Sequence, residues 1–288
     1  MKAIIWGING QDGFYLSELL IKEGIEVIGI GRFEESYKVD ISVFEDVVNL
    51  IKHNQPQFIF HLAANSTTQH IAWKENHETI STGALNILEA VKLFSPHTKV
   101  FLSGSGLQFE NLGLPIKETD HFKATSIYAV SRIHTVYAAR YYRQLGLKVY
   151  VGYFFNHDSP RRSERHINIK VISTAKRIAK GSDEKLVIGD LHVKKEFGFA
   201  GDIVKAIWTL VQQDKIEEAT IGTGQAYSIE EWVDLCFTLF NLKWQDHVIE
   251  SNAYTPEYKI LVSDPSSIHS LGWKPQTNIL ELAKMMCQ

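Results

Sequence analysis

The first 24 residues constrain the fold of this 288-residue chain more than any other stretch. Residues 2–6 form a short apolar run that predicts a buried strand, and the run ends directly in the segment GINGQDG at residues 7–13. Apolar residues then recur at helical spacing until Gly24, a residue type that commonly ends helices. A strand, a glycine-rich turn and a helix in this order predict a dinucleotide site, because glycines let the backbone approach a pyrophosphate at the positive end of a helix. An ordinary tight turn between a strand and a helix is the alternative interpretation.

Strands and helices continue to alternate through the first half of the chain. Residues 26–31, 58–64 and 100–102 predict further buried strands, and the amphipathic segments 42–53 and 79–94 predict helices between them. This alternation predicts an α/β fold, namely a Rossmann doubly wound parallel sheet with a smaller C-terminal substrate-binding lobe.

The order of the expected elements also sets the expected domain boundaries. The dinucleotide-binding Rossmann domain should comprise residues 1–165 and about 199–222. The smaller lobe should comprise residues 166–198 and 223–288.

Composition excludes several classes of function. The 30 basic and 33 acidic residues leave a net charge of −3, and hydrophobic residues make up 44% of the chain, so neither a nucleic-acid surface nor disorder is predicted. The two cysteines and 12 histidines show no metal-ligand spacing, which predicts no metal site and a reducing compartment. No apolar run approaches ~18 residues and the chain begins directly with its first strand, so we expect a cytoplasmic protein that does not bind membranes.

The end of the second predicted strand bears on the choice of cofactor. A Rossmann fold that binds NAD usually carries an acidic residue there, whereas this chain has Arg32. A guanidinium can pair with the 2′-phosphate of NADP, so NADP is predicted as the cofactor, with NAD as the alternative. Other residues expected on the nucleotide are Asp40, Ile41, Leu62, Ala63 and Ala64.

Three polar residues form a candidate catalytic group. Ser105 follows the buried strand at 100–102, and Tyr128 and Arg132 lie four residues apart on a predicted helix, which places them on one helix face. A tyrosine can act as a base near neutral pH when a cation stabilises its anion. Together the three residues could move a proton on or off a sugar hydroxyl. Taken singly, Tyr128 is equally well explained as a packed aromatic side chain and Arg132 as a solvated charge.

Five segments of the chain resemble the extended short-chain dehydrogenases/reductases, also called the NAD-dependent epimerase/dehydratase family, which act on nucleotide sugars. Within that group the chain is most similar to the GDP-mannose 4,6-dehydratases. The segments are GINGQDG at 7–13, YAVSR at 128–132, FNHDSPRR at 155–162, LHVKKEFG at 191–198 and LGWKP at 271–275. They span nearly the whole chain, and the segment at 155–162 is much more specific for GDP-sugar enzymes than the glycine turn.

The resemblance implies roles for particular residues. The catalytic residues would be Ser105, Tyr128 and Arg132. The cofactor would contact Gly7, Gly10, Gln11, Asp12, Gly13, Arg32, Asp40, Ile41, Leu62, Ala63, Ala64, Tyr128, Arg132 and Phe155. A GDP-sugar substrate would contact Ser105, Asn156, Arg161, Lys170 and Lys195.

The resemblance also implies a homodimer or homotetramer. The interface would include the helix that carries Tyr128 and Arg132. Its expected apolar and aromatic contacts are Ile133, Val136, Tyr137, Tyr141 and Tyr142.

The chain departs from the family pattern at four positions. Arg132 stands where the family has lysine, and Leu107 stands where the dehydratases have a catalytic glutamate. Thr255 and Ile169 stand where arginines are expected. Because leucine cannot accept or donate a proton, the sequence favours hydride transfer at C4 over elimination of water.

Three functions remain open at this point. The favoured prediction is an NAD(P)-dependent enzyme that acts at C4 of a GDP-mannose-type sugar, as a 4-keto reductase/dehydrogenase or an epimerase. The first alternative is a GDP-mannose 4,6-dehydratase in which Glu110, Asp158 or His157 replaces the missing glutamate. The second alternative is an inactive homologue that only binds the sugar nucleotide.

Overall fold

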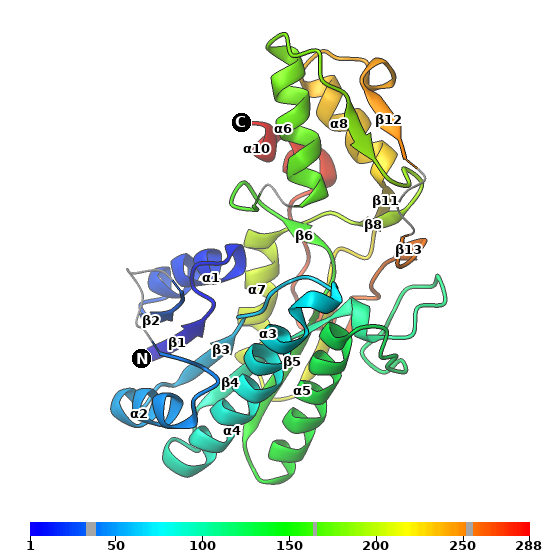
Figure 1. Ribbon diagram of the computed structural model, residues 1–288. Coiled ribbons are helices and arrows are strands. Elements are labelled where there is room, and N and C mark those ends of the chain that lie inside the picture. The colour runs from blue at the N-terminus through cyan, green and yellow to red at the C-terminus, as the bar shows by residue number, and fades with distance from the viewer. Residues whose placement is uncertain (33–38, 164–165, 252–255) are drawn as a thin grey trace.

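The computed structural model describes residues 1–32, 39–163, 166–251 and 256–288. Its centre is a sheet of six parallel strands in the order β10-β5-β4-β3-β1-β2 (Figure 1). The strands are β1 (Lys2–Trp6), β2 (Glu26–Ile30), β3 (Phe58–His61), β4 (Lys99–Ser105), β5 (Lys148–Phe154) and β10 (Glu218–Ile221). Strand order reverses between β1 and β3, and ligands of such sheets bind outside the carboxyl ends of the strands at that reversal.

Helices bury both faces of the sheet, which explains why the strands are continuous apolar runs. Along β1, Ile4 belongs to one core and Ile5 to the other, because successive side chains point to opposite faces. The first core is covered by α2 (Phe44–Asn54), α4 (Gly83–Phe94) and α5 (Ile127–Gln144). The second core is covered by α1 (Gln11–Lys22), α7 (Ala200–Val211) and α9 (Ser266–Ser270).

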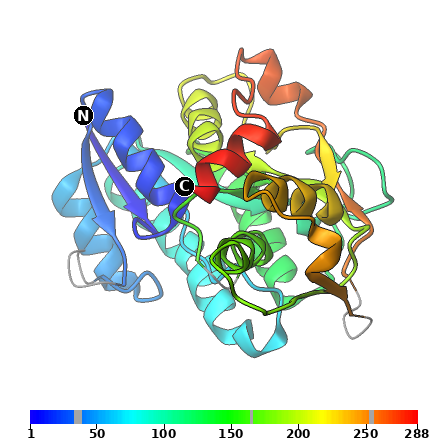
Figure 2. The same ribbon diagram turned by 90° about the horizontal axis from the view of Figure 1, so that it is seen from above.

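A smaller lobe lies beyond the carboxyl ends of the strands (Figure 1). Three α-helices among the described residues of this lobe, α6 (Ile167–Ala179), α8 (Ile229–Leu239) and α10 (Ile279–Cys287), share a third core. Figure 2 shows α10 beside α8. Ser228 and Asn278 each cap the first turn of a helix together with a glutamate three residues later, which fixes where α8 and α10 begin. The short strands are β6 (His157–Asp158), β7 (Leu186–Ile188), β8 (Lys194–Glu196), β9 (Gly198–Phe199), β11 (Ala226–Ser228), β12 (Val248–Glu250) and β13 (Ile260–Leu261).

The predicted fold class is confirmed, but one helix differs from the prediction. The segment predicted as a helix from residue 79 is preceded by η1 (His70–Ala72) and α3 (Trp73–Asn76), and it opens with a π-helical stretch, η2 (His77–Thr82). Two side chains contact carbonyl groups in this stretch. The His61 ring contacts the Thr79 carbonyl oxygen at 3.1 Å, and the Thr135 hydroxyl lies 3.2 Å from the Ile80 carbonyl oxygen and 3.0 Å from that of Ser131. The backbone of this stretch takes the wider π-helical hydrogen-bond pattern in place of the α-helical one.

Two single-turn helices complete the described elements: η3 (Gly106–Gln108) and η4 (Trp244–Asp246). None of the helices in the described ranges has the length and apolar character to span a bilayer. The domain boundaries given above stay a prediction.

Candidate active site

The glycine turn has the backbone geometry of a nucleotide cradle. Gly7 has a φ of +92°, and a Cβ there would lie 2.8 Å from the backbone nitrogen of Ala63. A Cβ at Gly13 would overlap the carbonyl oxygen of Gly7. Gly10 occupies the N-cap of α1 and no side chain caps that end, so the first N–H groups of the helix are available to an anion. The turn therefore fits a dinucleotide pyrophosphate.

Two adjoining cavities extend from this turn and share Gly7, Gly10, Leu62 and Ala64. The first, of about 250 Å³, lies over the carboxyl ends of β1, β3, β4 and β5, and the second, of about 810 Å³, lies beside the end of β2. Every residue predicted above to contact the cofactor lines one or both of them. We call them the catalytic cavity and the adenosine cavity.

Arg32 lines the adenosine cavity, but its guanidinium is engaged. It forms an ion pair with Glu75, and Asn65 donates a hydrogen bond of 2.8 Å to the other oxygen of the same carboxylate. The hydrogen bonds from Asn65 and Arg32 hold the pKa of Glu75 below its usual value. Four acidic residues line this cavity among those described: Asp40, Asp46, Glu75 and Glu78. A 2′-phosphate would therefore compete with Glu75 for Arg32.

The catalytic cavity brings the three predicted catalytic residues together. Ser105 is the N-cap of η3, where its hydroxyl accepts a hydrogen bond of 3.2 Å from the Leu107 N–H. Ser126 caps α5 through a 3.1 Å bond from the Ala129 N–H, which places Tyr128 in the first turn of that helix. Ser105, Tyr128 and Arg132 are all buried and all line the cavity.

Arg132 is held by a residue that the sequence interpretation did not include. Its Nη1 donates to the backbone carbonyl of Ser103 and, at 2.7 Å, to the Ser103 hydroxyl. Its guanidinium carbon lies 5.2 Å from the centroid of the Tyr128 ring. The Ser103 hydroxyl in turn donates to the His61 carbonyl oxygen at 2.9 Å. The only sequence signal for Ser103 is its place at the end of a buried strand.

A buried ion pair joins the glycine turn to the segment 155–162. His157 donates through Nε2 to Asp12 at 2.9 Å and through Nδ1 to the Phe155 carbonyl oxygen at 2.8 Å. Burial disfavours the charged form of both residues, but the attraction and hydrogen bond between them outweigh burial. The pKa of Asp12 is therefore lowered and that of His157 is raised. Gln11 and Ser159 add a hydrogen bond of 2.9 Å between the same two segments.

None of the three proposed substitutes for the missing glutamate presents a free carboxylate or base to Leu107. Glu110 pairs with Lys123 at 3.4 Å outside the cavity, Asp158 pairs with Arg162 at 3.3 Å, and His157 is engaged with Asp12. Among the described residues, the one carboxylate that lines the catalytic cavity is that of Asp12.

The predicted substrate contacts are only partly brought together. Ser105 and Asn156 line the catalytic cavity, whereas Arg161 stacks 3.7 Å from the centroid of the Phe14 ring and Lys170 donates to the Val187 carbonyl oxygen at 2.8 Å. The neighbouring Arg162 lines the cavity instead.

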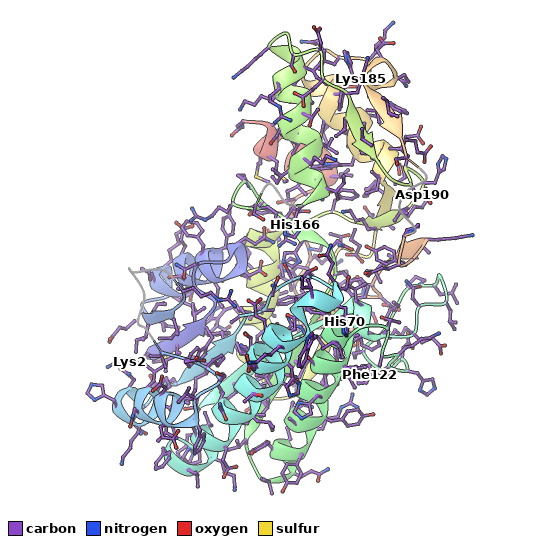
Figure 3. All side chains as sticks on the ribbon, viewed as in Figure 1. Lys2, His70, Phe122, His166, Lys185 and Asp190 are labelled. Atoms are coloured by element: carbon purple, nitrogen blue, oxygen red, sulfur yellow. The ribbon has the colours of Figure 1, made fainter. Side chains whose placement is uncertain are left out.

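Lys195 is buried close to the charges of Arg162 and Asp158. Burial lowers its pKa to about 8, with a further lowering by Arg162, although the charge of Asp158 opposes this shift. His166, labelled in Figure 3 where the lobe meets the sheet, precedes α6. Burial and the charge of Arg162 lower its pKa to about 4, so it is neutral at pH 7. The cationic side chains of Arg162 and Lys195 therefore lie close to the neutral imidazole of His166.

The parallel sheet, the glycine turn and the serine–tyrosine–arginine group define an extended short-chain dehydrogenase/reductase, a class of nicotinamide-dependent enzymes. The model of the GDP-mannose 4,6 dehydratase family matches residues 4–286. The chain belongs to the GDP-mannose 4,6-dehydratase family. It is similar to GDP-mannose 4,6 dehydratase 2 of Arabidopsis thaliana, at 33% identity over 99% of this chain and 85% of that protein.

Solved structures of other proteins share the fold. RMD from Pseudomonas aeruginosa, complexed with NADPH, has a TM-score of 0.87 at 19% identity and covers 99% of this chain and 96% of its own. The UDP-glucose 4-epimerase of Thermus thermophilus, in complex with NAD, has a TM-score of 0.83 at 21% identity and covers 100% of this chain and 98% of its own. The family match favours the dehydratase alternative over the C4 reductase or epimerase that the sequence interpretation preferred.

Proposed function

We propose that the protein binds GDP-mannose together with NAD(P) and acts on it by the chemistry of its family, a 4,6-dehydration that begins with oxidation at C4. The observation that carries this proposal is the catalytic cavity, in which Ser105, Tyr128 and Arg132 meet the glycine turn. The family match supplies the choice of sugar nucleotide.

Each catalytic residue has a distinct role in this proposal. Tyr128 accepts the proton of the C4 hydroxyl, and Ser105 holds that hydroxyl by a hydrogen bond. The guanidinium of Arg132 stabilises the phenolate form of Tyr128, which is the form that accepts this proton. A bound nicotinamide would supply the acceptor for the hydride of C4. The turn at Gly7, Gly10 and the N-terminus of α1 would hold its pyrophosphate.

The sugar nucleotide would lie between the sheet and the smaller lobe. Asn156 lines the catalytic cavity, and its side-chain oxygen lies 3.5 Å from the Tyr258 hydroxyl of the lobe. Arg162 and Lys195 supply positive charge for a diphosphate there. Arg161 and Lys170 face other partners and would have to move to contribute.

A C4 oxidoreductase or epimerase is the second candidate, and Leu107 favours it. Elimination of water across C5 and C6 needs a group that removes a proton, and leucine stands where the family has glutamate. Oxidation or reduction at C4 needs only Tyr128, Ser105 and the cofactor.

One experiment tests both candidates. The purified full-length chain is incubated with GDP-mannose, or with its 4-keto-6-deoxy product, and with NAD(H) or NADP(H). Nicotinamide absorbance and product mass are followed over time. Loss of water without net change in nicotinamide redox state supports the dehydratase. Net NAD(P)H formation or consumption supports the C4 oxidoreductase, and inversion at C4 with neither change, followed by NMR, supports the epimerase. Binding without turnover of any GDP-sugar would refute both and leave the inactive homologue.

We propose a homodimer in which α4 and α5 form the interface. Val130, Tyr137 and Tyr141 of α5 are exposed by 42, 59 and 56%, and Leu85 and Leu93 of α4 are also exposed. The prediction that Val136 and Tyr142 lie in the interface is wrong, because both side chains are buried in the core of their own subunit. Light scattering at micromolar concentration tests this assembly, and a monomer would refute it.

The choice between NADP and NAD belongs to the same proposal. Arg32 lies in the adenosine cavity and could pair with a 2′-phosphate, but only by giving up Glu75. We propose that NADP binds in this way, with NAD as the alternative, and that the protein acts in the cytoplasm.

A further inference from the structure

Arg132 and Ser103 form a buried contact between α5 and β4. Nη1 of Arg132 has two hydrogens, and both are engaged by Ser103, one by the carbonyl oxygen and one by the hydroxyl at 2.7 Å. Arg132 is 5% exposed and Ser103 is 2% exposed. A charge-assisted hydrogen bond that is shielded from water in this way holds its partners firmly.

This contact fixes the direction of the whole guanidinium group. Because the guanidinium is planar, anchoring Nη1 also sets where Nε and Nη2 point. Within the described part of the chain, Nε is buried and has no hydrogen-bond partner. Arg132 lines the catalytic cavity, and its guanidinium carbon lies 5.2 Å from the ring centroid of Tyr128. The guanidinium is thus held beside Tyr128.

The surroundings of Ser103 support this geometry. Its hydroxyl donates to the His61 carbonyl oxygen at 2.9 Å, which leaves its lone pairs to accept from Arg132. The His61 ring lies close enough for the charge of Arg132 to act on it. Burial, with the charge of Arg132, lowers the pKa of His61 to about 3, so the imidazole is neutral and does not repel the guanidinium.

We propose that Ser103 is a positioning residue that anchors Arg132, so that an arginine in this site can stabilise the Tyr128 phenolate and donate hydrogen bonds to a ligand in the catalytic cavity. The roles of Tyr128 and the cofactor in this inference rest on the proposed function. An ammonium can reorient freely on its flexible stem, whereas a forked guanidinium is useful only in a fixed orientation. Ser103 provides that orientation.

A double-mutant cycle on the full-length chain tests the proposal. The variants are Ser103→Ala, Arg132→Met and the two combined, with Ser131→Ala as the control. Ser131 is a fully buried serine of α5 whose hydroxyl has no partner among the described residues. The dissociation constants of NAD and NADP are measured by calorimetry, and thermal unfolding confirms that each variant is folded.

We expect Ser103→Ala to weaken cofactor binding about tenfold when Arg132 is present, because a hydrogen bond to a buried cation is lost. The same substitution should change binding less than about twofold in the Arg132→Met variant, where there is no guanidinium left to orient. Ser131→Ala should stay within about twofold of the parent protein. Equal effects of Ser103→Ala in both backgrounds would overturn the proposal and leave Ser103 as a packing residue only.

A second readout follows the reaction. Ser103→Ala should move the midpoint of the pH–rate profile with GDP-mannose to higher pH, because the phenolate is less well stabilised. An unchanged profile together with reduced rate would overturn the positioning role. If the parent protein turns over no GDP-sugar, the proposed function fails, but the cofactor-binding cycle still decides the role of Ser103.

Discussion

Replacing Glu75 by glutamine should raise the preference of the protein for NADP over NAD. In the structure the Glu75 carboxylate pairs with Arg32 at the edge of the adenosine cavity. Glutamine keeps the size of the side chain and removes its charge. Arg32 is then free to pair with a 2′-phosphate, and the phosphate no longer meets a carboxylate.

The expected magnitude follows from the exposure of the pair. The Arg32 and Glu75 side chains are 73 and 36% exposed, so their ion pair contributes only about 0.2–1 kcal/mol. Repulsion between a carboxylate and a phosphate at the same solvated edge adds about 1 kcal/mol. The sum of about 1–2 kcal/mol corresponds to a change of about 5- to 30-fold in the ratio of the two dissociation constants.

Calorimetric titration of the parent protein and Glu75→Gln with NADP and with NAD measures this ratio. The affinity for NAD should change less than about threefold, because the 2′-hydroxyl of NAD is neutral. Glu78→Gln is the matched control, since Glu78 lines the same cavity but pairs with Lys74 at 3.6 Å. The reasoning is refuted if Glu75→Gln leaves the ratio within about twofold of the parent value, or if Glu78→Gln shifts it equally.

Three other substitutions test the site. Leu107→Glu places a carboxylate in the catalytic cavity and should raise the yield of dehydrated product at least about tenfold, measured by mass spectrometry. An unchanged yield would contradict the idea that a carboxylate at position 107 removes the proton in the elimination. Asp12→Asn should lower the free energy of unfolding by about 3 kcal/mol. The loss should be largest between pH 3.8 and 6.5, because the stabilisation by Asp12 disappears as pH falls through its lowered pKa and that by His157 as pH rises through its raised pKa. Urea unfolding at several pH values would show this window, and a loss that does not vary with pH would contradict it. Gly7→Ala should abolish NAD(P) binding, because the added Cβ would lie 2.8 Å from a backbone nitrogen. Gly24 also has a positive φ, but no atom lies within 4 Å of a Cβ added there, so Gly24→Ala should lower stability without affecting binding. Calorimetry measures the binding and thermal unfolding measures the stability.

The fold could be predicted because its causes are local. A strand buried on both faces is an apolar run, as at Ile4 and Ile5, and the glycine turn has a required backbone geometry. The side-chain pairings of the site have no such signal. Arg132 meets Ser103 across 29 positions of the sequence and Arg32 meets Glu75 across 43. Both contacts involve long, flexible side chains whose conformations are decided only in the folded protein. A sequence pattern does not give those conformations.

The place of β10 at the edge of the sheet has a consequence for synthesis of the chain. Its partner β5 ends at Phe154, and residues 155–217 must leave the ribosome before β10 can follow. During that interval the outer N–H and C=O groups of β5 are unpaired, and an open strand edge of this kind readily pairs with other chains. The half-made protein is therefore most prone to aggregate after β5 emerges and before β10 does, and this is the stage at which a nascent-chain chaperone should bind it.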